Sequence, residues 1–226
     1  MGLILPRYDI EMIHKMRTTV KKMRALSDWS DIEVKKIFRK YYRIAGSIRN
    51  VQLLIIKIRR GDAGIPFSFI EWLEGHLHHL KIVWQETYRQ KKIKKEYYKL
   101  KKVLKSRKRT QHALRFALDK NEQIIAFRNA RPLNDERIHN GRKIIKEIDY
   151  LNKWENKPSD DAIKKLADTT GNYMDAVSDI QLLELYIEQE IDQAKRNAAN
   201  SLLSEWIQNK DTDMKKLLKS IDTLSA

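Results

Sequence analysis

The feature that most limits how this chain can fold is the near absence of residues that interrupt helices. Seven Gly and four Pro are spread over 226 residues, and the clearest breaks are the short segments 61–66, 131–132 and 157–158. Between these breaks, apolar residues recur every three or four positions, and helix-favouring Lys, Glu, Leu, Ile and Ala are abundant. The pattern predicts an all-α protein.

We expect roughly eight helices. In the first helix, one apolar stripe holds Met12, Ile13, Met16, Val20 and Met23. Ser30-Asp31-Ile32-Glu33 resembles a capping box that begins the second helix, and Gly46 either ends that helix or packs tightly within it. The other expected helices cover 49–60, 69–107, 117–129, 135–154, 159–170, 173–206 (with a break near Ala199) and 213–224.

A stretch of the sequence occurs twice, 125 residues apart. Residues 11–50 (the first copy) and 136–175 (the second copy) share nine identities without a gap. The repeated pairs include Glu11 and Glu136, His14 and His139, Arg17 and Arg142, Lys21 and Lys146, Lys40 and Lys165, and Gly46 and Gly171. Helices that merely share a fold would share apolar spacing, so these polar identities suggest that both copies contribute to one site. The repeat predicts two pseudo-symmetric, roughly four-helix bundles, 7–115 and 116–226, within one domain covering 1–226.

Positive charge is concentrated in the first half of the chain. The net charge is +16, and residues 1–115 hold 29 Lys and Arg against 10 Asp and Glu, whereas residues 116–226 hold 17 against 20. Such an excess destabilises the compact state through self-repulsion, which favours an anionic partner. The alternative is a surface of solvated lysines.

The repeated polar residues fall on one face of the first helix. At 100° per residue, His14, Arg17, Lys21 and Arg24 occupy a stripe about 80° wide, directly beside the apolar stripe. Phosphate oxygens accept charge-assisted hydrogen bonds from such cations, and a nearby polyanion favours a protonated His. The face therefore predicts a groove that binds a polyanion.

The second copy keeps this pattern with fewer cations. Glu147 replaces Lys22, and Asp149 replaces Arg24. Either His alone would be interpreted as an ordinary histidine without a ligand. Repetition with an Arg three residues later and a Lys seven residues later favours a functional role for both.

These motifs resemble the CHAD (conserved histidine α-helical) domain family. Residues 14–24, followed by Gly46 and Arg49-Asn50, are similar to the family's opening pattern, although the family usually has Asp at the position of Asn50. The second half resembles the family's internal repeat through His139, Arg142, Lys146, Tyr150, Gly171 and Asp175. The resemblance implies two four-helix bundles with a basic central surface that binds inorganic polyphosphate. By position it implies binding roles for His14, Arg17, Lys21, Lys22, Arg24, Arg39, Lys40, Arg43, Arg49, His139, Arg142, Lys146 and Lys165.

A second basic region lies between residues 89 and 115. It contains thirteen Lys and Arg and one acid, Glu96, on an apolar spacing that is typical of a helix. Because these cations repel one another, an anionic ligand would stabilise the segment. The candidate contacts here include Lys92, Lys95, Lys99, Lys102 and Arg109.

The sequence therefore predicts non-catalytic binding of inorganic polyphosphate, or a similar linear polyanion, in a basic groove between two bundles, without a cofactor. No paired base or acid cluster suited to Mg²⁺ is evident beside the basic stripe. The leading alternative is a nucleic-acid-binding protein, although neither a helix-turn-helix element nor a stacking platform is recognisable, and the five Trp are expected in cores.

Three further alternatives have less support. Glu11-x-x-His14 and Glu136-x-x-His139 match the motif of di-metal carboxylate bundles, but the cations on the same face would oppose bound metal. His76 and His79 lack a third ligand at a suitable spacing. Residues 89–109 could instead bind an anionic membrane surface.

The sequence also suggests a compartment. It has no Cys, no apolar N-terminal stretch of signal-peptide length and no run of about 18 apolar residues. We therefore expect a soluble, cytoplasmic protein, for which association with polyphosphate granules would be reasonable. The oligomeric state is not predicted.

Overall fold

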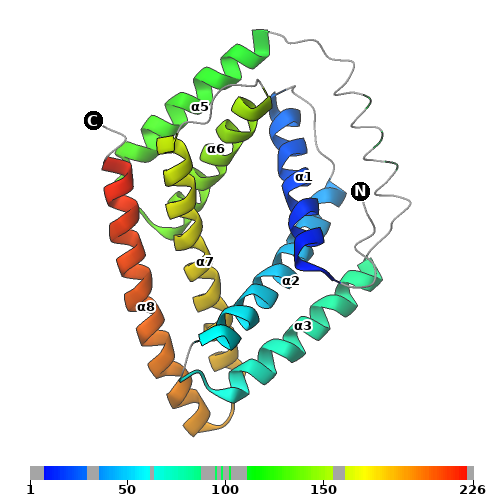
Figure 1. The fold of residues 1–226 in the computed structure, drawn as a ribbon, viewed down its shortest axis with the longest axis vertical. Coiled ribbons are helices and arrows are strands. Elements are labelled where there is room, and N and C mark those ends of the chain that lie inside the picture. Colours follow the sequence, from blue (N-terminus) through cyan, green and yellow to red (C-terminus); the bar gives the residue numbers. More distant parts are fainter. Residues whose placement is uncertain are drawn as a thin grey trace. The chain divides into compact units, whose positions relative to one another are not determined.

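The computed structural model describes residues 8–29, 36–61, 64–87, 95, 98, 102, 111–154 and 161–222. Within these residues every regular element is an α-helix (Figure 1), which confirms the predicted fold class. The helices are α1 (Ile10–Trp29), α2 (Lys36–Gly61), α3 (Phe67–Thr87), α5 (Gln111–Asn129), α6 (Asp135–Trp154), α7 (Asp161–Gln189) and α8 (Gln193–Asp222). None of these described helices is long and apolar enough to cross a membrane.

The helices that open the two copies, α1 and α6, begin with the same cap. Asp9 Oδ1 accepts a hydrogen bond from the Met12 amide at 2.8 Å, and Asn134 Oδ1 accepts one from the Arg137 amide at 2.9 Å. Asp9 and Asn134 are 125 residues apart, like the repeat itself. Each side chain satisfies an amide that has no partner within its own helix. The duplication thus extends into local structure just before the first identical residue.

Two glycines that looked like helix breaks lie within continuous helices. α2 runs through Gly46 and α7 runs through Gly171, so separate helices at 49–60, 159–170 and 173–206 were wrong predictions. Of the two roles considered for Gly46, tight packing is the one found. A Cβ on Gly46 would lie 2.9 Å from Cζ of Arg17, so the missing side chain makes room for a neighbouring helix.

The break in the C-terminal region lies at residues 190–192 and not near Ala199, which is buried within α8. Glu190 Oε1 accepts hydrogen bonds from the amides of Ile191 and Asp192, each at 3.0 Å. Asp192 Oδ1 then caps α8 by accepting the Ala194 amide at 2.8 Å. Since no comparable break occurs near residue 210, α8 also includes most of the helix expected at 213–224.

Other expected elements fall outside the described residues. The capping box at 30–33 lies there, as does most of the predicted helix beyond Thr87. Lys95 and Lys102, from the second basic region, are described as exposed helical residues.

The described chain divides into two compact units. Unit 1 comprises residues 1–17, 39–88 and 175–212, and unit 2 comprises 18–38, 89–174 and 213–226. Each unit takes residues from both of the halves expected from sequence. The arrangement of those halves as two related bundles therefore stays a prediction.

Unit 1 has an apolar core built from four helices, α2, α3, α7 and α8. Phe69 of α3 lies at its centre, with ring centroids 5.2 Å from Tyr186 and 6.2 Å from Trp206. Complete burial of residues such as Phe69 and Leu73 contributes about 1.5–3 kcal/mol each to stability. The core residues are Val51, Leu54, Ile55, Ile58, Phe69, Leu73, Ile180, Leu183, Tyr186, Ala199, Leu202 and Trp206.

Unit 2 is held together by contacts among α5, α6 and α7. Phe127 of α5 packs directly on Gly141 of α6, where a Cβ would lie 2.6 Å from Cζ of the ring and closer to two other ring carbons. The hydroxyl of Tyr173 on α7 donates to Asp135 at the start of α6. These contacts fix α6, which carries the second copy's cations.

Buried positions repeat with the same 125-residue spacing as the identities. Many buried residues of α1 match buried residues of α6, and many of α2 match those of α7 even where the residue type differs. The matching buried pairs are Ile13 and Ile138, Val20 and Ile145, Met23 and Ile148, Tyr41 and Leu166, Ala45 and Thr170, Ile48 and Tyr173, Ile55 and Ile180, and Ile58 and Leu183. Met12, expected in the apolar stripe, is instead 36% exposed.

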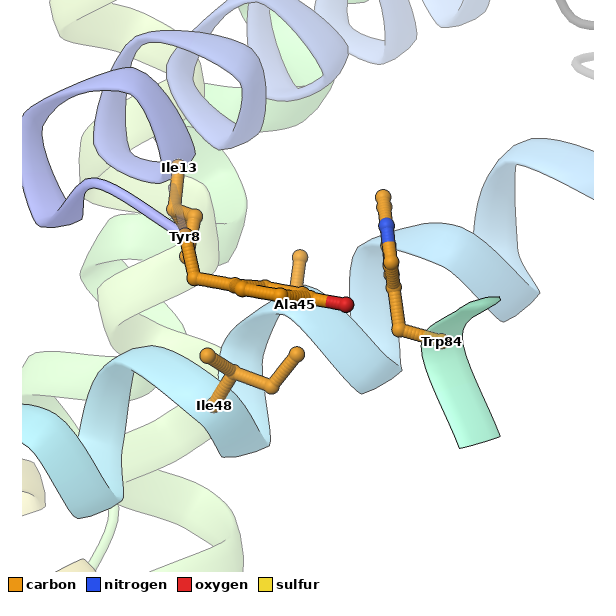
Figure 2. Close-up of a pocket in the computed structure, with 5 residues that line it drawn as sticks. All are labelled: Tyr8, Ile13, Ala45, Ile48 and Trp84. Atoms are coloured by element: carbon orange, nitrogen blue, oxygen red, sulfur yellow. The ribbon is translucent and has the colours of Figure 1, made fainter. Parts of the chain in front are cut away.

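Tyr8 fixes the start of α1 against α2 and α3. Its carbonyl accepts a hydrogen bond from Gln52 at 2.8 Å, its hydroxyl donates to the Lys81 carbonyl at 3.1 Å, and its φ of 44° lies in the left-handed region. Figure 2 shows its ring across Ala45, with the hydroxyl end toward Trp84. The small gap here is apolar, so it suits packing and not an anion.

Candidate functional site

The first copy's cations lie on α1 and on the first half of α2. On α1, His14 and Lys22 are exposed, whereas Lys21 and Arg24 are half-buried. On α2, Arg39, Lys40 and Arg43 are exposed. The predicted spacing along α1 is preserved because the helix continues from Ile10 to Trp29.

Arg17 is bound to α2. Its Nη1 donates to the Tyr42 carbonyl at 2.6 Å, and its Nη2 donates to the Tyr42 hydroxyl at 3.2 Å. The guanidinium carbon also lies 4.1 Å from the centre of the Tyr42 ring, a cation–π arrangement. Gly46 provides the space in which this guanidinium rests.

Arg49 and Asn50 follow on α2. Arg49 is half-buried, and its buried Nε has no hydrogen-bond partner among the described residues. Asn50, where the resembled family usually has Asp, donates to the Ser178 hydroxyl of α7 at 2.8 Å. Asn50 therefore joins two helices of unit 1.

Arg142 occupies the position that matches Arg17, but its surroundings differ. An ideal Cβ on Gly171 would lie 3.7 Å from Nε and Nη2 of Arg142, an ordinary contact distance. Ala167 stands at the position of Tyr42, so the hydroxyl and aromatic ring are missing from this copy. The buried Nε of Arg142 has no hydrogen-bond partner within the described part of the chain.

A cluster of positive charge surrounds His139 in unit 2. Partial burial of the ring lowers the pKa of His139 below 6.5, and the nearby cations Lys143, Arg142 and Lys21 lower it further. His139, Arg142 and Lys143 share one face of α6, whereas Lys21 comes from α1. We call these four residues the His139 cluster.

The two acids that distinguish the second copy are both paired with lysines. Glu147 forms a salt bridge of 2.7 Å with Lys120 of α5, in which the two side chains are 19% and 15% exposed. Asp149 forms one of 2.8 Å with Lys153, four residues further along α6. Because each acid has its own cation, neither needs to neutralise the His139 cluster.

The remaining predicted residues are only partly placed. Lys146 is half-buried and Lys165 is exposed, on α6 and α7 of unit 2. Lys95 and Lys102 are exposed, whereas Lys92, Lys99 and Arg109 lie outside the described residues. The cations described therefore divide between the units, with His14, Arg17, Arg39, Lys40, Arg43 and Arg49 in unit 1 and the others in unit 2.

Three of the five Trp side chains and the His76 ring are described in packed surroundings. Trp84 and Trp206 are buried and Trp72 is half-buried, while the side chains of Trp29 and Trp154 lie outside the description. His76 stacks on Trp72 at 4.9 Å, and burial together with His79 lowers the pKa of His76. No group of three or more His, Asp or Glu among the described residues could hold a metal ion.

Sequence reasoning missed three residues that shape this site. Lys143 was missed because its counterpart in the first copy is Thr18, although a Lys four residues after His139 is a local signal. Tyr42 and Lys120 act across helices, and spacing along one helix does not reveal such partners.

Comparisons with protein-family models, with curated proteins and with solved structures found no match. The resemblance to the CHAD family therefore stays an expectation from the motifs.

Proposed function

We propose that this protein binds inorganic polyphosphate, or a closely similar linear polyanion, through cations on α1, α2, α6 and α7, without catalysing a reaction. The observation that carries the proposal is the His139 cluster, in which side chains of two helices place several positive charges together. Burial contributes most to the lowered pKa of His139, and Lys143, Arg142 and Lys21 lower it further. The positive potential of these three cations attracts anions.

The chemistry of the cluster suits phosphate. Arg142 can offer a planar pair of donors to phosphate oxygens, and Lys21 and Lys143 can contribute point charges. His139 gains a second N–H donor once a polyanion restores its proton. The paired state of Glu147 and Asp149 supports this assignment, because those acids are already neutralised by Lys120 and Lys153.

A linear ligand also fits the distribution of charge along the sequence. Further exposed cations lie on α1 and α2, among them Lys22, Arg39, Lys40 and Arg43. Because a long polyanion can contact several separate cationic positions, it gains affinity from each, and each contact adds to the salt dependence of binding.

Competition separates polyphosphate from nucleic acid. Fluorescently labelled polyphosphate is titrated with the protein at one salt concentration, then displaced with unlabelled polyphosphate, single-stranded DNA or duplex DNA at matched charge. We expect polyphosphate to compete far better than either DNA. Displacement by DNA at equal charge would overturn the proposal in favour of a nucleic-acid binder. Stoichiometric iron or manganese in the same preparation would favour the di-metal alternative.

A further inference from the structure

The two repeated arginines meet different surroundings, and this difference deepens the proposed function on which it rests. Arg17 has hydrogen bonds from both terminal nitrogens and a ring beneath its guanidinium, all provided by Tyr42. One acceptor is a main-chain carbonyl of α2, so the interaction joins one helix to another. A ligand that recruited this guanidinium would have to break these contacts first.

The distance between each arginine and the glycine beneath it also differs between the copies. A side chain on Gly46 would overlap the Arg17 guanidinium, which lies flush against α2. A side chain on Gly171 would meet Arg142 only at van der Waals distance. Arg17 is therefore fitted closely against α2, whereas Arg142 lies less closely against α7.

Arg142 also has an unused donor. Its Nε is buried and has no hydrogen-bond partner among the described residues, which is unfavourable for a charged group. Lys143 and Lys21, the other cations of the His139 cluster, carry no hydrogen-bond acceptor, so neither side chain can pair with this N–H. An anionic oxygen would satisfy the donor and relieve the repulsion together.

We propose that Arg17 is a positioning residue that fixes α1 on α2, and that Arg142 is the repeated arginine that binds a phosphate oxyanion of the polyanion. This assignment gives the ligand-binding arginine to the second copy, although positive charge is concentrated in the first half of the chain. The duplicated pair then has one structural member and one ligand-binding member.

The test compares Arg17→Ala with Arg142→Ala in thermal unfolding and in polyphosphate titration well below the melting temperature. We expect Arg17→Ala to lower Tm by several degrees and to change Kd by less than about threefold. We expect Arg142→Ala to raise Kd about tenfold and to leave Tm within about a degree of wild type. Equal losses of affinity in both variants, or a lower Tm with unchanged affinity in Arg142→Ala, would overturn the assignment.

Milder variants keep the test decisive if Arg17→Ala does not fold. Tyr42→Phe removes one of the Arg17 hydrogen bonds, and we expect a slightly lower Tm with unchanged affinity; weaker binding would contradict the assignment. Arg142→Lys keeps the charge and should recover part of the affinity. If wild type binds but Arg142→Ala binds equally well, the arginine assignment fails and the proposed function stands. If wild type binds no polyphosphate, both the proposed function and the binding role of Arg142 are wrong. The Tm of Arg17→Ala still tests whether Arg17 fixes α1 on α2.

Discussion

The two copies of the repeat keep the same framework and use it differently. Both begin with a side-chain cap, bury residues at matching positions and place an arginine over a glycine of the following helix. In the first copy Tyr42 engages that arginine, whereas in the second Ala167 offers neither ring nor hydroxyl, and the buried Nε of the arginine has no hydrogen-bond partner among the described residues. The difference teaches that identity of sequence across a repeat need not mean identity of role. Repeated polar residues can be retained for packing in one copy and for binding in the other.

The largest expected effect comes from removing the cations around His139. The triple variant Lys21→Ala, Arg142→Ala, Lys143→Ala should bind polyphosphate about 100-fold more weakly, which corresponds to about 2.7 kcal/mol. The reason is that these side chains would form the strongest charge-assisted contacts with phosphate. Fluorescence titration at fixed salt measures the change.

A matched control removes the same charge elsewhere. Lys195, Lys215 and Lys219 are exposed on α8, and their joint replacement by Ala should weaken binding by less than about fivefold. Equal losses in the two triple variants would show that net charge, and not the His139 cluster, determines affinity.

The next effect concerns the aromatic residue that distinguishes the first copy. Tyr42→Ala should lower the free energy of unfolding by about 2 kcal/mol, because it removes the ring and the hydroxyl that engage Arg17. Tyr42→Phe should cost about 0.5–1 kcal/mol, because only the hydroxyl is lost. Urea unfolding followed by circular dichroism gives both values. A larger loss for Phe than for Ala would contradict the contact described for Arg17.

A pair of glycine substitutions compares the copies directly. Gly171→Ala should raise stability by up to about 1 kcal/mol, because Ala favours helices and its Cβ fits at 3.7 Å from Arg142. Gly46→Ala gains the same helix preference, but its Cβ would displace the Arg17 guanidinium. The net effect on stability should therefore be neutral or destabilising. Chemical denaturation of the two variants checks the difference. An equal gain in both would mean that Arg17 is not fitted against Gly46.

The smallest expected effect is a dependence on pH. Because the pKa of His139 is lower when folded than the unfolded value near 6.5, the unfolded state binds more protons between these two values. Stability should therefore rise with pH through that window and become independent of this group above it. His139→Gln should flatten this rise, as measured by Tm from pH 5 to 7.5. His78→Gln, on α3, is the control, and an equal change in that variant would exclude the assignment to His139.

The sequence predicted the helices better than their ends. Continuous apolar spacing and few Gly or Pro were sufficient for the fold class, and the repeat indicated which polar residues deserved comparison. Gly46 and Gly171 were misleading because glycine weakens an isolated helix, yet both lie within continuous helices. At Gly46 the space left by the missing side chain admits Arg17 from another helix. That arginine is distant in sequence, so local propensity carries no information about it.

The candidate site shows the same limit. The sequence shows the spacing of His139 and Arg142 along one helix. It does not show that Glu147 is paired with Lys120 of another helix. Counting charges in each half shows only that the excess of positive charge lies in the first half of the chain. The contacts of individual side chains favour the second copy for binding, since charge acts through local surroundings and not through totals.

The most direct test follows the Nε–H signals of arginine by nuclear magnetic resonance in protein labelled with ¹⁵N-arginine. The signals of Arg17 and Arg142 are assigned with Arg17→Lys and Arg142→Lys, and polyphosphate is then added in steps. We predict that the Arg142 signal shifts in proportion to bound ligand, because its unsatisfied donor acquires a phosphate acceptor, while the Arg17 signal stays in place. A shift of Arg17 with no change at Arg142 would contradict the central claim.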